Sequence, residues 1–113
     1  MSSFDFAIKR GDRKPDLIVT LKDASGNAVD LTGATALFNM RVISGAVLKV
    51  NASAVVDPDQ VANKGKVSYA WLAADTDTAG VYEGEFEMTF AGGLAQTFPN
   101  PTHMTVHIED DLN

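Results

Sequence analysis

The sequence predicts an all-β fold, an antiparallel β-sandwich of about seven to nine short strands that forms a single domain over residues 1–113. Three observations support this prediction. Short segments of alternating apolar and polar residues recur along the chain, with turn-forming residues every 8–12 positions or so. No long segment shows the helical periodicity of an amphipathic α-helix. With 113 residues, 45% of them hydrophobic and 21% charged, the chain has the composition of one ordered globular domain.

The clearest strand pattern lies between residues 80 and 90. The large apolar side chains fall on one face of the predicted strand, with Gly84 between them: Tyr82, Phe86, Met88 and Phe90. The opposite face carries Val81, Glu83, Glu85, Glu87 and Thr89. Because successive side chains of a strand alternate between its faces, one face is apolar and the other carries three carboxylates. Gly92-Gly93 then predicts a turn, after which residues 94–98 return as the partner strand.

The remaining elements follow from the same alternation and from the turn residues between them. Further strands are predicted over residues 4–9, 16–23, 34–43, 46–56, 65–72 and 103–109, with one short helical turn within residues 73–78. Tight turns are predicted at Ala24–Asn27 and at Ser44-Gly45. The predicted core positions of two strands are Ala36, Phe38, Met40 and Val42, and then Val67, Tyr69 and Trp71.

The segment from Thr78 to Tyr82 is similar to the tyrosine corner of immunoglobulin-like sandwiches, in which a tyrosine hydroxyl near the start of a strand bonds back to the preceding backbone. The sequence therefore predicts an immunoglobulin-like sandwich without the antibody-type disulfide. Four aromatic residues are expected in its core: Trp71, Tyr82, Phe86 and Phe38. An alternative role for Trp71 or Tyr69 is an exposed platform on which a carbohydrate stacks.

Composition and charge restrict the class of protein. The chain has no cysteine, which excludes disulfides and thiolate metal sites and fits folding in a reducing cytoplasm. No apolar run has the length of a signal peptide or of a membrane span, so no membrane partner is expected. All nine lysines and arginines lie in residues 1–66 beside seven acidic residues, whereas residues 67–113 contain eight acidic residues and no lysine or arginine. This acidic balance argues against binding to nucleic acid.

No motif predicts catalysis, a cofactor or a metal site. The segment Asp75–Gly80 imitates the start of a calcium-binding EF loop, but Ala79 stands at the fifth position and Phe86 at the twelfth. His103 and His107 would lie about 13 Å apart along one strand, too far to share a metal ion. We therefore expect a protein that is not an enzyme and that binds no cofactor.

Two charged segments are the candidate interaction sites. The first is the row formed by Glu83, Glu85 and Glu87 on one strand face, expected either to be solvated or to meet a basic partner. The second is the basic turn after the first strand, which contains Lys9, Arg10, Arg13 and Lys14. We expect the basic turn to be the counterpart of the acidic row when copies or partners meet.

The order of several motifs resembles a known family. These motifs are FAIKRGD (residues 6–12) with Pro15, LKDASGNAVDLTGA (residues 21–34), GKVSYAW (residues 65–71), DTDTAGVYEGEF (residues 75–86) and Thr97-Phe98-Pro99. Together they are similar to the N-terminal immunoglobulin-like domain of upper baseplate proteins of tailed bacteriophages and to small phage structural proteins of that kind. The similarity extends over nearly the whole chain.

The resemblance implies a structural protein of the virion, made in the bacterial host cytoplasm and placed in the tail or baseplate. Its expected partners are other phage structural proteins and further copies of itself in a symmetric assembly. Larger family members continue into a helical stalk, which residues 1–113 do not include, so adaptor, capsid-decoration and head-fibre roles are alternatives. A carbohydrate-binding module for the host surface is the alternative from another functional class.

Overall fold

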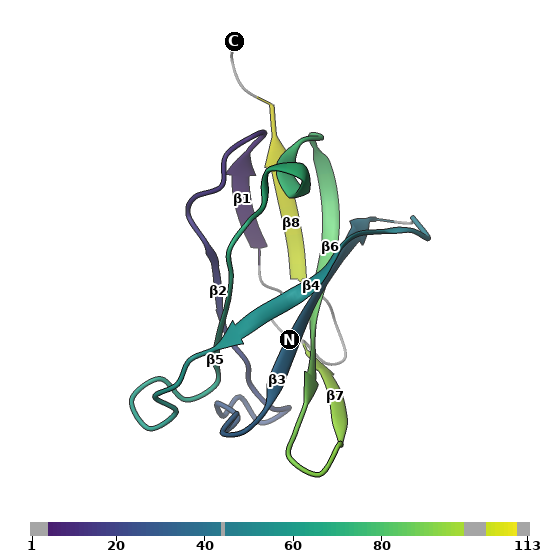
Figure 1. Cartoon of the computed structure of the whole chain (residues 1–113). Coiled ribbons are helices and arrows are strands. Elements are labelled where there is room, and N and C mark those ends of the chain that lie inside the picture. The colour runs from purple at the N-terminus through teal and green to yellow at the C-terminus, as the bar shows by residue number, and fades with distance from the viewer. Residues whose placement is uncertain (1–4, 44, 99–103, 111–113) are drawn as a thin grey trace.

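The computed structural model describes residues 5–43, 45–98 and 104–110, and within these ranges the chain forms eight strands and one short 3₁₀ helix (Figure 1). The strands are β1 (Asp5–Lys9), β2 (Leu17–Thr20), β3 (Thr35–Val42), β4 (Leu48–Val56), β5 (Lys66–Tyr69), β6 (Gly80–Thr89), β7 (Ala95–Phe98) and β8 (Met104–Glu109). The helix η1 (Ala73–Thr76) lies between β5 and β6. The predicted all-β class and the predicted number of strands are therefore confirmed.

The strands form two layers that share β4. The order of neighbouring strands is β1-β8-β6-β3-β4-β5-β2, and β7 adds to the free part of β6. The first part of β4 pairs with β3, whereas its last residues, Val55 and Val56, pair with β5. The pairing of β2 with β5 in one layer, and of β3, β6 and β8 in the other, is the pairing of an immunoglobulin-like sandwich.

One edge pair departs from the antiparallel pairing of the predicted sandwich. β1 pairs with β8 in the parallel direction, with Asp5 opposite Thr105 and Lys9 opposite Glu109, while every other pair of described strands is antiparallel. A hairpin forces its two strands to be antiparallel, but β1 and β8 are separated by almost the whole chain. Their relative direction therefore depends on the course of all the strands between them.

The core is filled by the aromatic residues that the sequence predicted. Phe38 of β3 lies at the centre, with ring centroids at 4.8 Å from Tyr69, 5.1 Å from Phe86 and 5.8 Å from Trp71. Phe6 stacks on Trp71 at 5.7 Å. These tilted and edge-on pairs contribute about 0.5–1.5 kcal/mol each beyond the burial of their area. The predicted core role of Trp71, Tyr82, Phe86 and Phe38 is confirmed, since all four are buried.

The tyrosine corner forms as predicted. The hydroxyl of Tyr82 donates a hydrogen bond of 2.8 Å to the backbone carbonyl of Thr78, four residues earlier. The expected helical turn is η1, directly before the corner. The corner fixes the direction in which β6 leaves η1, so it also positions every residue that β6 carries.

Some strand limits differ from the prediction for local reasons. β2 ends at Thr20 rather than at residue 23, because Asp23 already accepts the turn hydrogen bonds from Ser25 and Asn27. Val42 was a predicted core residue, but it is half-exposed because β3 extends past the core at this end. The predicted residues Phe4, Ser44, Pro99 and His103 lie outside the described residues.

Gly84 is required by close packing. A Cβ atom at this position would lie 3.1 Å from Cε1 of Phe38 and 3.3 Å from Cγ of Met104. Both neighbours are completely buried and have little room to move. The gap in the apolar face of β6 is therefore the space that the ring of Phe38 occupies.

We expect Gly84→Ala to lower the free energy of unfolding by about 1–3 kcal/mol, because the added methyl group overpacks the core beside Phe38. Urea denaturation of both proteins measures the difference. Ala95→Gly, at an exposed position of β7, is a control for general effects of substitution in this hairpin. A G84A protein as stable as the wild type would contradict this account of the core.

We expect Tyr82→Phe to lower the free energy of unfolding by about 1 kcal/mol, because it removes the hydrogen bond to the carbonyl of Thr78 while keeping the buried ring. Thr89→Val, which removes an exposed hydroxyl at the end of β6, should change stability by less than about 0.5 kcal/mol. Equal unfolding midpoints for Y82F and the wild type would show that the corner bond does not stabilise the fold.

Candidate functional site

The predicted acidic row lies on the outer face of β6, and the register of β3 decides what each carboxylate meets. Glu83 stands opposite Arg41, Glu85 opposite Asn39 and Glu87 opposite Leu37. Only the first of these pairs brings opposite charges together. The three glutamates therefore have three different environments, a difference that alternation along β6 alone does not reveal.

Glu83 is engaged within the chain. Its Oε1 atom lies 2.6 Å from Nε of Arg41, and its side chain is 15% exposed. Glu85 is half-buried and Glu87 exposed, and neither forms a salt bridge with another described residue. Of the three carboxylates predicted on this face, Glu83 is thus paired with Arg41, and Glu85 and Glu87 are the two that a partner could use.

The polar surface continues from Glu85 across two neighbouring strands. Asn39 of β3 lies opposite Glu85, and Asn51 of β4 donates a hydrogen bond of 2.6 Å to the side-chain oxygen of Asn39. A hollow of about 160 Å³ lies beside this row and is lined by Asn39, Arg41, Leu48, Glu83 and Glu85. Pockets for small-molecule ligands usually measure roughly 300–1,000 Å³, so this hollow has the size for a single side chain of a partner.

Exposed apolar residues border the hollow at the end of the β3–β4 hairpin. We call Ile43, Val47, Leu48 and Val81 the hairpin patch. Leu48 lines the hollow and lies opposite Arg41, and the backbone N–H of Ile43 donates to the carbonyl of Val81. Val47 directly precedes Leu48 in the chain. The hairpin extends away from the rest of the sandwich (Figure 1). A partner that covers the hollow therefore also meets an apolar surface.

The structure does not bring the basic turn to the acidic row. Lys9 lies 3.7 Å from Glu109, Arg10 lies 3.1 Å from Asp110, and Lys14 lies 2.9 Å from Asp16. The remaining cation, Arg13, donates from Nε to the backbone carbonyl of Trp71 at 3.1 Å. The local charge of this turn is therefore largely balanced by carboxylates of the same chain, which weakens its expected role as a counterpart of the acidic row.

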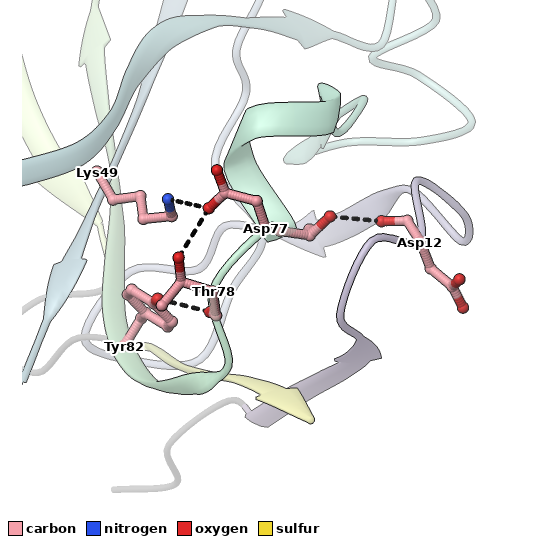
Figure 2. A network of polar contacts seen from close by, with 6 residues as sticks. Asp12, Lys49, Asp77, Thr78 and Tyr82 are labelled. Atoms are coloured by element: carbon pink, nitrogen blue, oxygen red, sulfur yellow. Dashed lines mark hydrogen bonds and ion pairs between the residues drawn. The ribbon is translucent and has the colours of Figure 1, made fainter. Parts of the chain in front are cut away.

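The segment that imitates a calcium loop is a structural corner (Figure 2). Asp75 is buried and accepts hydrogen bonds from the hydroxyl of Tyr69 at 2.6 Å and from the N–H of Leu72 at 2.9 Å. Asp77 instead pairs with Nζ of Lys49 at 2.6 Å and accepts a bond from the hydroxyl of Thr78. The two carboxylates thus serve separate partners.

Two pKa values are shifted in this corner. The hydrogen bond from Lys49, followed by that from Thr78, holds the pKa of Asp77 below its usual value. Burial, followed by the hydrogen bond to Asp75, raises the pKa of Tyr69 well above its usual value. Tyr69 therefore remains a protonated donor to Asp75 over the ordinary pH range. The hydrogen bonds that contribute to both shifts also hold η1 and the corner in place.

Sequence reasoning missed Lys49 and Arg41 as partners of acidic residues. The register of β3 and β4 shifts between Met40 and Arg41, and Lys49 lies at this irregularity, from which it reaches Asp77. No local pattern in the sequence indicates such a shift. Arg41 carried a usable signal, since it lies on the outer face of a strand, but its partner depends on the register with β6.

The carbohydrate platform is contradicted for the two residues considered. Trp71 is 1% exposed and Tyr69 is 3% exposed, so neither ring is available for stacking on a sugar. His107 lies on β8 opposite Val81 and Ala7, and His103 lies outside the described residues.

The comparisons identify no relatives. A scan against protein-family models finds no match, and a search of curated proteins finds no significant match. Among the described residues, no helix is long and apolar enough to cross a membrane.

We expect Asp77→Asn to destabilise the protein at neutral pH and to have progressively less effect as the pH falls. The pKa of Asp77 is lower in the folded than in the unfolded protein, so ionised Asp77 stabilises the fold above its unfolded pKa of about 3.9. This contribution is lost as the pH falls through the lower, folded-state value. Urea midpoints of D77N and the wild type from neutral to acidic pH measure the effect.

A difference between D77N and the wild type that stays constant down to the most acidic pH would contradict this prediction. Asp5→Asn, at an exposed position of β1 outside the corner, is the control for loss of one carboxylate.

Proposed function

We propose that the chain is a non-enzymatic structural component of a bacteriophage virion, a module of the tail or baseplate or an adaptor, that binds other phage structural proteins through its surface. One observation carries this proposal. The motif DTDTAGVYEGEF, one of those whose order carries the family resemblance, forms a continuous unit that contains the end of η1, the tyrosine corner and the first part of β6. This motif of the resemblance therefore positions β6 and its outer face.

The surface that β6 carries supports a role in protein binding. Glu85 and Glu87 lie without salt bridges to described residues, and Glu85 lines a hollow of side-chain size that Leu48 of the hairpin patch also lines. Protein interfaces combine apolar anchors with charged groups that fix orientation and select the partner. A partner with a basic side chain and an apolar neighbour would satisfy both parts of this surface.

Burial of the aromatic residues favours this proposal over a module that binds host carbohydrates. Carbohydrate binding by stacking needs an aromatic ring exposed at the surface, and Trp71 and Tyr69 fill the core instead. Two polar side chains near them bond within the chain: Asp75 accepts from Tyr69 and from the N–H of Leu72, and Thr76 donates to the carbonyl of Asp12.

The proposal is tested by asking whether the chain is part of the particle. Purified particles of a phage that encodes this chain should contain it in a constant ratio to the major tail protein, as measured by quantitative mass spectrometry. Deleting its gene and supplying the protein from a plasmid should restore that ratio. Particles that assemble normally and lack the chain would overturn the proposal.

We expect Glu85→Lys, supplied in the same way, to reduce incorporation about tenfold, the change produced by losing roughly 1.4 kcal/mol of binding free energy. The substitution reverses the unpaired charge beside the hollow, where a basic group of the partner would bind. Asp12→Lys makes the same change of charge at an exposed position of the turn after β1, outside the residues that line the hollow, and should incorporate like the wild type. Normal incorporation of E85K would exclude the acidic face as the binding surface.

A further inference from the structure

The loop from Asp57 to Gly65, between β4 and β5, holds one apolar side chain almost completely in solvent. Val61 is 97% exposed, and the residue before it, Gln60, is buried. A single exposed valine on a mobile loop needs no explanation, but this loop is fixed by an extensive set of hydrogen bonds. A buried amide and an exposed valine thus occupy consecutive positions of a hydrogen-bonded loop.

Gln60 anchors the loop from within. Its Oε1 atom accepts bonds from the N–H of Leu31 at 3.0 Å and from the N–H of Gly65 at 2.9 Å, and its Nε2 atom donates to the carbonyl of Asp57 at 2.8 Å. Asp59 completes the loop, since its Oδ1 atom accepts from the N–H groups of Val61 and Ala62. Val61 is therefore held in a fixed position, and a partner that binds it has little conformational entropy to remove.

The hairpin patch lies at the opposite end of the same strand. β4 begins at Leu48, within the patch, and ends at Val56, directly before the loop. Nine residues of strand separate the two features by about 27 Å at the usual rise per residue. Figure 1 shows the loop beyond β5 and the β3–β4 hairpin on opposite sides of the molecule. One copy of the chain cannot bring them together, whereas two copies can.

The charges beside the two features have opposite signs. Lys64 is exposed on the loop of Val61, within electrostatic range of Asp30, and Glu85 is half-buried beside the hollow. Neither forms a salt bridge with a described residue. In a contact that places Val61 against the hairpin patch, Lys64 is the natural partner for Glu85. We call the exposed side chain of Val61 the knob. The knob with its neighbouring cation is thus complementary to the hairpin patch with its neighbouring carboxylate.

We propose that copies of this chain associate head to tail, with the Val61 loop of one copy docked on the hairpin patch and hollow of the next. Such a contact uses two different surfaces, so it generates a ring if the rotation closes and an open chain if it does not. The inference rests on the proposed function as a structural protein and specifies the contact between its copies. It predicts a free knob and a free patch at the two ends of every open assembly.

The test uses the purified chain and light scattering. The mass of the wild type should rise above the monomer value of 12.0 kDa as the concentration increases toward about 1 mM, where weak protein contacts become occupied, and should fall again at high salt. Val61→Asp removes the knob, and the double variant Val47→Asp/Leu48→Asp removes the patch. All three positions are exposed, and circular dichroism checks that both variants are folded.

Each variant alone should remain monomeric, whereas their mixture should form a heterodimer and nothing larger, because one functional knob meets one functional patch. Leu94→Asp, at an exposed position in the β6–β7 turn, is the matched control and should associate like the wild type. A wild type that stays monomeric, a V61D protein that still associates, or a mixture that stays monomeric would each overturn the proposal. Absence of the chain from purified particles would overturn its proposed function instead, and would leave the measured contact between copies unaffected.

Discussion

The alternation of side chains along β6 is the constraint on which the rest of the structure depends. Tyr82, Phe86 and Met88 fill the core from its inner face, while Glu83, Glu85 and Glu87 occupy the outer face. A shift of one residue against β3 would exchange the two sets and bury three carboxylates. Burying one unpaired carboxylate costs several kcal/mol. The cost of burying three together is therefore comparable to the whole stability of a typical domain, about 5–15 kcal/mol. The shifted register of β6 is therefore strongly disfavoured. β3, β7 and β8 pair with β6 in the observed register.

This fixed register determines the chemistry of the outer surface. Because Phe38 must lie opposite Phe86 in the core, Arg41 necessarily lies opposite Glu83 three positions further on, and Asn39 opposite Glu85. The ion pair and the hollow are thus consequences of core packing rather than independent features. The same argument extends to β4, whose irregular pairing beside Met40 places Lys49 within reach of Asp77 and places Leu48 on the rim of the hollow.

Local patterns in the sequence were sufficient to predict most of the strands and turns. They were not sufficient to predict the contacts between segments far apart in the chain. Alternation and glycine turns predicted β6, its hairpin with β7, the tyrosine corner and the aromatic core, because each depends on residues within one short segment. The parallel pairing of β1 with β8, the ion pairs of Arg41 and Lys49, and the buried contacts of Gln60 join segments far apart in the chain. For the same reason the sequence identified the charged residues of the candidate site but not their partners. Glu83 is paired with Arg41, and three cations of the basic turn are paired with other carboxylates of the chain.

Buried and exposed polar groups have different purposes in this molecule. The buried ones, Asp75, Thr76 and Gln60, all bond to backbone groups and hold a loop or corner in place. Stabilisation of these loops does not require an apolar side chain at their tips, and a polar residue at position 61 would leave every hydrogen bond of Asp59 and Gln60 intact. The hydrogen bonds of the loop therefore leave position 61 free to carry either a polar or an apolar side chain. In the proposed contact between copies, the fixed loop presents this valine to the apolar hairpin at the other end of β4 of the next copy.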